Sequence, residues 1–377
     1  MTATTRSAAR KEEKSGGALS AAQAQPGSKH KTEESAGSPG PKRSKTQEEK
    51  EQKTIDETLG HGNTQHEAQN GTKTGKQETK GKAGGAFAVE PGARDGSEQV
   101  PSSILEKGII YFFFRGRVGV DEPSDVNEIA RSYIILRPVE RDAKLGSGSI
   151  GDAGNSRVCV IPKKVLPQSG RERWTAFVEK SGASFQQLKE EFLSSSDYET
   201  KTAGTRHTPA ATPVGEGVYA ITSTGRESHL AYILTLPEEL GEVQREMGLK
   251  EKGSFIISTK NPQHPGPANA RLPKPPEYPK ELLDEFRSLR WAPTQPKHLD
   301  FVNTQFLLVG ESSGLEKALA QQEEDKEEGN AEPEEEMEKL EDEDTKRMKD
   351  LSRDDSGRIF ADLQVNAADY PRLKTTF

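Results

Sequence analysis

One apolar stretch indicates where this chain begins to fold: Gly108-Ile109-Ile110-Tyr111-Phe112-Phe113-Phe114-Arg115-Gly116-Arg117-Val118-Gly119. It holds four consecutive aromatic residues, Tyr111 to Phe114, beside β-branched residues, a composition typical of a buried β-strand. Nothing earlier in the sequence could start a hydrophobic core, because Phe87 is the only aromatic residue among residues 1–102. The stretch therefore marks the beginning of the folded region.

The chain of 377 residues divides around this stretch into an arm, a folded region and a tail. Residues 1–102 are polar, and too little apolar surface is present to offset the roughly 1–2 kcal/mol of backbone entropy lost per ordered residue. We expect a disordered N-terminal arm there. Residues 312–355 contain 18 Asp and Glu against 7 Lys and Arg, an acidic low-complexity tail. Residues 356–377 regain apolar side chains, as a C-terminal hydrophobic short motif that either folds back or binds a partner.

Between residues 103 and 311, short apolar runs alternate with Gly, Pro, Ser and Asp clusters, the pattern of β-strands joined by turns. Eight strands are expected, over 109–114, 132–136, 157–161, 175–178, 218–221, 230–236, 254–258 and 301–309. Short helices are expected after Ser184, Pro237 and Pro279. Because strands and helices do not alternate regularly, a doubly wound parallel sheet is disfavoured. We predict a mainly β (β-rich α+β) fold, an antiparallel barrel or sandwich with about three short helices, flanked by long disordered arms.

A weak internal repeat suggests a second way to organise the folded region. The segments 131–136 and 157–161 have counterparts in 229–236 and 254–258, and each pair ends in a basic, proline-containing exit. Two related β units, over 104–193 and 214–310, are therefore an alternative to one continuous domain.

Support for catalysis is weak, and we predict no catalytic residue, no cofactor and no metal site. Residues 146–151 match the G-x-G-x-x-G spacing. A charged turn precedes them and no helix follows, which favours a flexible hairpin loop over a phosphate cradle. Cys159, the single cysteine, lies in an apolar strand, where a small buried hydrophobe is expected and a nucleophile is not. No Cys or His cluster has zinc spacing. An enzyme is therefore the less favoured interpretation.

Polar residues at or near the expected strands are the candidates for contact with a pocket ligand or a partner. They are Arg115, Arg117, Arg131, Tyr133, Tyr219 and His229. In one alternative they line a pocket at the barrel mouth of an enzyme or small-ligand-binding protein. In another, Tyr111–Arg117 belongs to an RNA-binding module, since aromatic rings stack on bases and arginine meets phosphate. Four aromatics in a row fit a strand covered on both faces better, so direct nucleic-acid contact is disfavoured.

The arm and the tail carry the localisation and partner signals. Lys42, Arg43 and Lys45 form a basic nuclear-localisation tetrad with the serine between them, after a Pro-Gly-Pro turn. The acidic tail is typical either of a solvated charged segment or of a docking site for basic nuclear proteins such as histones. No apolar run approaches the roughly 20 residues of a membrane span. We expect a soluble protein, nuclear or otherwise cytoplasmic, with protein partners.

Three blocks carry a resemblance to a known family: GIIYFFFRGRVGVDEP at 108–123, ARSYIILRP at 130–138, and GEGVYAI with HLAYILTLPEELGEVQREMG within 215–248. They resemble filamentous-fungal proteins commonly labelled BTB-domain transcription factors. The resemblance covers most of the folded region and implies a nuclear or regulatory role. We therefore predict a non-enzymatic nuclear regulatory or scaffold protein that binds protein partners through a β-rich domain and an acidic tail.

Overall fold

The computed structural model describes residues 89–90, 100–202, 204–266, 271–351 and 353–377. The arm expected to be disordered lies almost wholly outside the described residues, and so do Lys42, Arg43 and Lys45. The fold described below belongs to the remainder of the chain.

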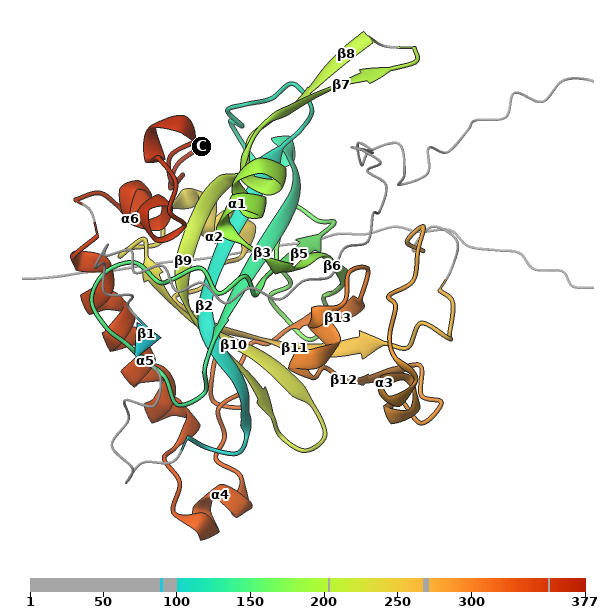
Figure 1. The fold of residues 1–377 in the computed structure, drawn as a ribbon, viewed down its shortest axis with the longest axis vertical. Coiled ribbons are helices and arrows are strands. Elements are labelled where there is room, and N and C mark those ends of the chain that lie inside the picture. The colour runs from blue at the N-terminus through green and yellow to red at the C-terminus, as the bar shows by residue number, and fades with distance from the viewer. Residues whose placement is uncertain (1–88, 91–99, 203, 267–270, 352) are drawn as a thin grey trace, which may run out of the picture. The chain divides into compact units, whose positions relative to one another are not determined.

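Eight antiparallel strands close into a barrel (Figure 1). In barrel order they are β2 (Ile104–Gly116), β3 (Ile129–Val139), β5 (Ser156–Ile161), β6 (Arg173–Ala183), β13 (Gln305–Gly310), β11 (Lys252–Lys260), β10 (Ser228–Leu236) and β9 (Thr212–Ser223). The pairing of β9 with β2 completes the circle, which removes the open edges that promote aggregation. The predicted mainly β, antiparallel barrel is confirmed, and each expected strand overlaps one barrel strand.

The barrel is built from two consecutive four-stranded meanders. The first contains β2, β3, β5 and β6, and the second contains β9, β10, β11 and β13. The two first strands pair with each other, β2 with β9, and the two last strands pair likewise, β6 with β13. The meanders lie within the ranges 104–193 and 214–310 proposed for two β units, apart from the first two residues of β9. They share one closed sheet.

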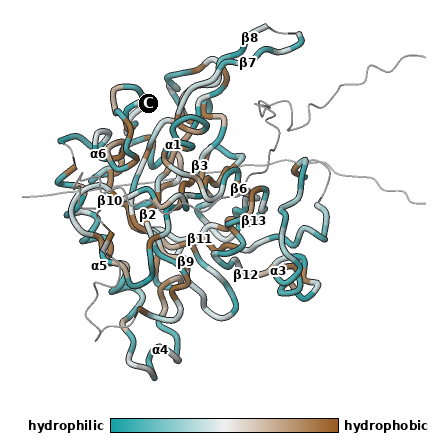
Figure 2. Tube along the Cα trace, viewed as in Figure 1, coloured by the Kyte–Doolittle hydropathy of each residue, from teal (hydrophilic) through white to brown (hydrophobic). Residues whose placement is uncertain are grey.

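Shorter strands decorate the barrel. β1 (Val89–Glu90) pairs with β4 (Lys144–Leu145), and β12 (Trp291–Pro293) pairs with the end of β11. β7 (Ser196–Thr200) and β8 (Gly204–Thr208) form a hairpin that projects from the barrel (Figure 1). In Figure 2 this hairpin is mostly hydrophilic, whereas the hydrophobic colouring concentrates on the barrel strands.

Helices lie at the three expected places and again near the C-terminus. The described part contains α1 (Phe185–Gln187), continued by a π-helical turn over Leu188–Leu193, then α2 (Glu242–Met247), α3 (Lys280–Glu285), α4 (Glu323–Glu328), α5 (Pro333–Lys349) and α6 (Asp355–Asp362). Short 3-10 turns cover Val126–Glu128, Pro296–Asp300 and Ala367–Asp369. The predicted capping box at Ser184 and Gln187 is present.

The central strand β2 explains how the barrel is packed. Alternate side chains of a strand point to opposite faces. Ile110, Phe112 and Phe114 belong to a cluster with members from all eight strands, which can only be the barrel interior. Tyr111 and Phe113 belong to a second cluster on the outside, which includes residues of the C-terminal helices. The aromatic run is therefore buried on both faces, as expected, and offers no ring on which a base could stack.

The stretch 312–355, expected to be an acidic tail separate from the folded region, is packed on the barrel. Its helix α5 buries Met337, Leu340 and Met348 in the outer cluster, while many of its acidic residues face solvent. The hydrophobic motif that follows also folds back, with Ile359 and Phe360 of α6 fully buried. Figure 1 shows α5 and α6 on one side of the barrel. Enough apolar surface is present on one side of each helix to hold it in place.

Candidate functional site

The barrel interior is filled by side chains. A void of about 10 Å³ lies among the residues Ile134, Leu136, Cys159, Ile221, Leu230, Ile257, Leu299 and Phe306, less than one water molecule requires. Leu299, from the 3-10 turn Pro296–Asp300, and Val243 and Met247, from α2, pack into the interior cluster from outside the strands. The filled interior argues against the ligand pocket considered for the barrel mouth.

A polar group inside the barrel is internally satisfied. Arg157 Nη1 donates to both carboxylate oxygens of Glu106, at 2.7 and 2.8 Å. The hydroxyl of Tyr219 donates to Glu106 Oε1 at 2.7 Å, and Arg157 Nη2 lies 2.7 Å from Asp300 Oδ1. Burial, and then the charge of Glu106, raise the pKa of Tyr219 well above its usual range. These groups stabilise one another, and none is left free to act on a ligand.

Three of the six predicted contact residues come together on the outer surface. The guanidinium of Arg115 lies 6.0 Å from the ring centroid of Tyr133, and Arg131 is an electrostatic neighbour of the same hydroxyl. Arg115 also donates to the backbone carbonyls of Phe192, Ser194 and Pro209. Tyr133 is only 4% exposed. The group therefore anchors the segment after α1 to the barrel.

The other three predicted residues are separated from this group and from each other. Arg117 is exposed in the turn after β2, and Tyr219 points into the barrel. His229 is buried on the outward side of β10, with its Nδ1 atom 2.8 Å from Glu311 Oε2. Ser254 donates to the same carboxylate oxygen at 2.8 Å. The six residues do not form one site.

Two sequence motifs have structural roles. The glycine-rich residues 146–151 form a loop between β4 and β5, and the next regular element is a strand, so the helix N-terminus that holds a pyrophosphate does not follow. Burial raises the pKa of the Cys159 thiol to about 12, so the thiol stays protonated at neutral pH. Cys159 is 1% exposed and packs as a small hydrophobe.

One outer face of the barrel is sealed by the C-terminal helices through a buried ionic network. Arg347 of α5 lies at its centre and is 1% exposed. Its guanidinium is 2.6 Å from Asp362 Oδ1 of α6 and 3.2 Å from Glu216 Oε1 of β9, and it also contacts Asp344. One arginine thus joins both helices to the barrel.

Strands β2 and β3 complete this network. Arg137 Nη1 lies 3.1 Å from Asp362 Oδ2 and donates to the hydroxyl of Tyr111 at 3.0 Å, and Tyr111 in turn donates to Asp362. The amide of Ile150, in the glycine-rich loop, donates to Asp362 Oδ1 at 2.9 Å. Asp362 therefore ties four separate chain segments together.

The charges of the network explain its protonation. Three carboxylates face two guanidinium groups, and Glu216 Oε2 has no hydrogen-bond partner in the described structure. Burial, and then Asp362 and Asp344, raise the pKa of Glu216 well above its usual range. Burial alone would also raise the pKa of Asp362, but Arg347 and Arg137 outweigh burial and lower it. A neutral Glu216 leaves two positive and two negative charges, which balance.

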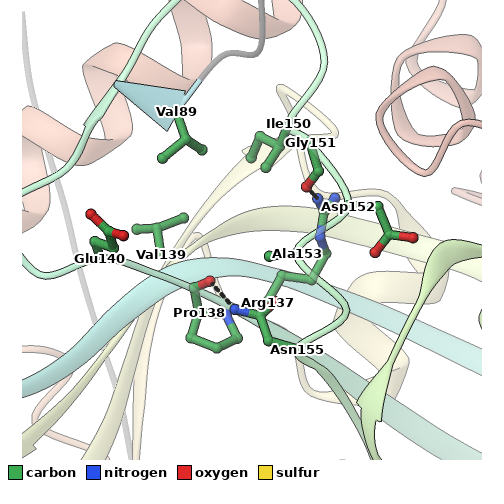
Figure 3. Close-up of a pocket in the computed structure, with 10 residues that line it drawn as sticks. All are labelled: Val89, Arg137, Pro138, Val139, Glu140, Ile150, Gly151, Asp152, Ala153 and Asn155. Carbon is green, nitrogen blue, oxygen red and sulfur yellow. Dashed lines mark hydrogen bonds between the residues drawn. The ribbon is translucent and has the colours of Figure 1, made fainter. Parts of the chain in front are cut away.

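A pocket of about 390 Å³ lies beside this network, outside the barrel (Figure 3). Arg137 forms part of its wall and donates to the carbonyl of Gly151, while Asn155 donates to the carbonyl of Pro138. Val89 of β1 lines another side. The volume suits a small ligand. None of the six predicted contact residues lines this pocket.

Strands β13 and β11 lie across the barrel from β2 and β3, and among the described residues they contribute nothing to the cluster that holds the C-terminal helices. There, five outward side chains of β6, β13 and β11 are half-buried, and we call them the bare face: Thr175, Ile256, Ser258, Leu307 and Val309. The strand register places Ile256 beside Val309, and Ser258, Leu307 and Thr175 in the next row. In the described part of the chain, Ile256, Leu307 and Val309 belong to neither core cluster. They form a half-buried apolar stripe on the outside of the barrel.

The described residues contain no group of His, Cys, Asp and Glu side chains arranged to hold a metal ion. Within the same residues, no helix is long and apolar enough to cross a membrane. No protein-family model matches the chain, and no curated protein or solved structure is significantly similar to it.

Reasoning from sequence missed both the ionic network and the bare face. Arg347 and Asp344 sit among many charges of the same stretch, which hides their burial. In β13, Phe306, Leu307 and Leu308 are all apolar, so no alternation marks the side that faces solvent.

Proposed function

We propose that this chain is a non-enzymatic scaffold protein that binds a protein partner through the bare face of its barrel. This proposal rests on one observation: the C-terminal helices cover one outer face of the barrel and not the other. The C-terminal helices bury the outward residues of β2 and β9, while Ile256, Leu307 and Val309 stay half-exposed on hydrogen-bonded strands. Apolar patches bordered by polar groups are typical of protein interaction sites. A rigid sheet also presents its side chains with little loss of entropy on binding.

The regulatory and nuclear parts of the proposal depend on the arm and the tail. We place import with the basic residues Lys42, Arg43 and Lys45. The exposed side of α5 carries Glu334, Glu335 and Glu338, and this side supports a second contact, with basic nuclear proteins. An import reporter that carries Lys42→Ala, Arg43→Ala and Lys45→Ala is expected to stay cytoplasmic. Nuclear accumulation of that variant would contradict the localisation.

Affinity capture with matched variants tests the bare face. The test variant carries Ile256→Thr, Leu307→Thr and Val309→Thr, which keep β-branched or strand-compatible side chains while adding polarity. The control carries Val118→Thr, Leu289→Ser and Val302→Thr, the large hydrophobic residues exposed elsewhere in the described structure. Partners retained by the wild type and the control, but lost by the test variant, are expected. Identical partner sets for all three proteins would refute the proposal.

The pocket of Figure 3 supports a second candidate function, the binding of a small ligand outside the barrel. Ala153, on its wall, allows a direct test. The variant Ala153→Phe is expected to abolish any thermal stabilisation that a ligand library produces in the wild type. Stabilisation that survives this substitution would place the ligand elsewhere.

A further inference from the structure

Three cations gather at one end of the bare face. Lys260, the last residue of β11, donates to Gln305 Oε1 at 2.8 Å. Arg271 Nε donates to the carbonyl of Gly266 at 2.8 Å, and a Cβ atom on Gly266 would lie 2.9 Å from Lys260 Nζ. Lys260 and Arg271 therefore approach the same glycine. We call Lys260, Arg271 and Arg290 the basic corner.

Arg290 belongs to the corner through the backbone. Its carbonyl accepts a hydrogen bond from the amide of Asn261, the neighbour of Lys260, at 2.9 Å. The Arg290 side chain is exposed. Burial, and then the charges of Arg271 and Arg290, lower the pKa of Lys260, which agrees with three cations held close together.

The basic corner is not neutralised by carboxylates of the residues that the structure describes. Among the described residues, no ion pair joins Lys260, Arg271 or Arg290 to an acidic side chain. Lys297, on a neighbouring segment, is by contrast paired with Glu285 at 2.7 Å. An uncompensated positive cluster raises the local concentration of negatively charged partners and speeds their association.

The apolar stripe connects this corner to a further cation. Next to Lys260 on the outward side of the sheet is the row that contains Leu307, and beyond it is the row in which Val309 of β13 pairs with Arg173 of β6. Arg173 is exposed, and no ion pair in the described structure involves it. Ile256 lies four positions before Lys260 on β11, which is about 13 Å along the strand. The face thus presents positive charge at both ends and aliphatic side chains between them.

We infer that the partner segment bound by the bare face is an acidic, aliphatic-rich peptide whose carboxylates pair with the basic corner and with Arg173. This inference rests on the proposed function, since it names the chemistry of the partner for the same surface. Nucleic acid fits the face less well, because Ile256, Leu307 and Val309 offer no ring for stacking. Because Arg173 lies two strands across from β11 as well as four residues along it, its Cα is about 16 Å from that of Lys260. A peptide with leucine, isoleucine or valine between Asp and Glu residues about 16 Å apart matches both the charge and the apolar centre.

Selection from a random 16-residue peptide library displayed on phage, against the full chain, tests the inference. Enrichment of peptides with Asp or Glu flanking aliphatic residues is expected. The best synthetic peptide should bind about tenfold more weakly to the variant Lys260→Gln, Arg271→Gln, Arg290→Gln, and more weakly as salt is raised. The control Lys201→Gln, Arg226→Gln, Lys346→Gln removes three exposed cations elsewhere and should leave the affinity unchanged. Arg290→Glu alone, at an exposed position, repeats the test without altering packing.

The outcomes separate the inference from the proposed function. Suppose that the best peptide loses affinity for the Ile256→Thr, Leu307→Thr, Val309→Thr variant but not for the basic-corner variant. The inference is then wrong and the proposed function stands. If the peptide binds all variants equally, or no peptide is enriched, the inference is wrong, and the capture experiment with the three threonine substitutions decides the proposed function separately. Tighter binding of a 20-nucleotide single strand than of any peptide, lost in the basic-corner variant, would also overturn the inference.

Discussion

Two outer faces of the same barrel differ in what covers them. The face formed by β2, β3, β9 and β10 is sealed by α5 and α6, and buried charges bind these helices to the strands. The bare face of β6, β13 and β11 carries half-buried aliphatic residues, and the cations at its ends form no ion pair within the described part of the chain. Burial of the first face stabilises the fold, while exposure of the second lowers stability unless a partner covers it. The difference indicates that the chain covers one face with its own C-terminal helices and leaves the other face available for a partner.

Arg347 should have the largest effect on the sealed face. Arg347→Ala leaves Asp344 buried without its counterion and Asp362 with Arg137 alone, and we expect a loss of about 3–5 kcal/mol in the free energy of unfolding, measured by urea titration. Lys326→Ala, in an exposed pair with Glu323, should cost less than about 1 kcal/mol. A loss below about 1 kcal/mol for Arg347→Ala would show that α5 does not seal the barrel.

A matched pair of leucines compares the two faces directly. Leu340 of α5 is fully buried in the outer cluster, whereas Leu307 is half-exposed on β13. Leu340→Ala should therefore cost about 2–5 kcal/mol of unfolding free energy, and Leu307→Ala less than about 1 kcal/mol. Equal costs would remove the distinction between the faces.

The raised pKa of Glu216 leads us to expect a pH-dependent free energy of unfolding. Its folded-state pKa is raised, so above the usual glutamate pKa the folded protein keeps a proton that the unfolded chain releases. Stability from this group is complete at lower pH and is lost as pH rises through the raised pKa. Between about pH 5 and about pH 8, the wild type should lose about 1 kcal/mol or more relative to Glu216→Gln, which mimics the neutral acid. If the unfolding free energies of the two proteins, measured by urea titration, changed equally between these pH values, Glu216 would not be neutral in the folded protein.

The smallest effect on stability is expected on the bare face. The variant Ile256→Thr, Leu307→Thr, Val309→Thr should unfold within about 1 kcal/mol of the wild type, because these residues pack against neither core cluster. Differential scanning calorimetry measures this change. A loss of several kcal/mol would mean that the stripe is part of the core and not a surface kept for binding.

The strands were predictable from the sequence because their signal is local. Runs such as Ile109–Phe114 are too apolar and too β-branched or aromatic to be anything but strand, and glycine or proline marks their ends. Helix α5 was missed because Met337, Leu340 and Met348 are its main apolar anchors among many charges. Part of its buried side is ionic, and the partners of Arg347 lie far away in the sequence or hidden within the same charged stretch.

The candidate surfaces were less predictable than the strands. Alternation shows that Tyr133 and Tyr219 each lie on one side of a strand, but only closure of the barrel decides that Tyr133 is outside and Tyr219 inside. The bare face is defined by which strands the C-terminal helices leave uncovered. That choice depends on long-range contacts, which no window of neighbouring residues contains.

Hydroxyl-radical footprinting of the full chain, alone and with the captured partner, compares the solvent accessibility of the two outer faces in one experiment. Methionine is readily oxidised, yet Met337 and Met348 on the sealed face should stay unmodified in both samples. Ile256, Leu307 and Val309 should be labelled in the free protein and protected in the complex. Rapid oxidation of Met337 in the free protein would show that α5 does not seal the barrel, and unchanged labelling of the bare face in the complex would show that the partner does not bind there.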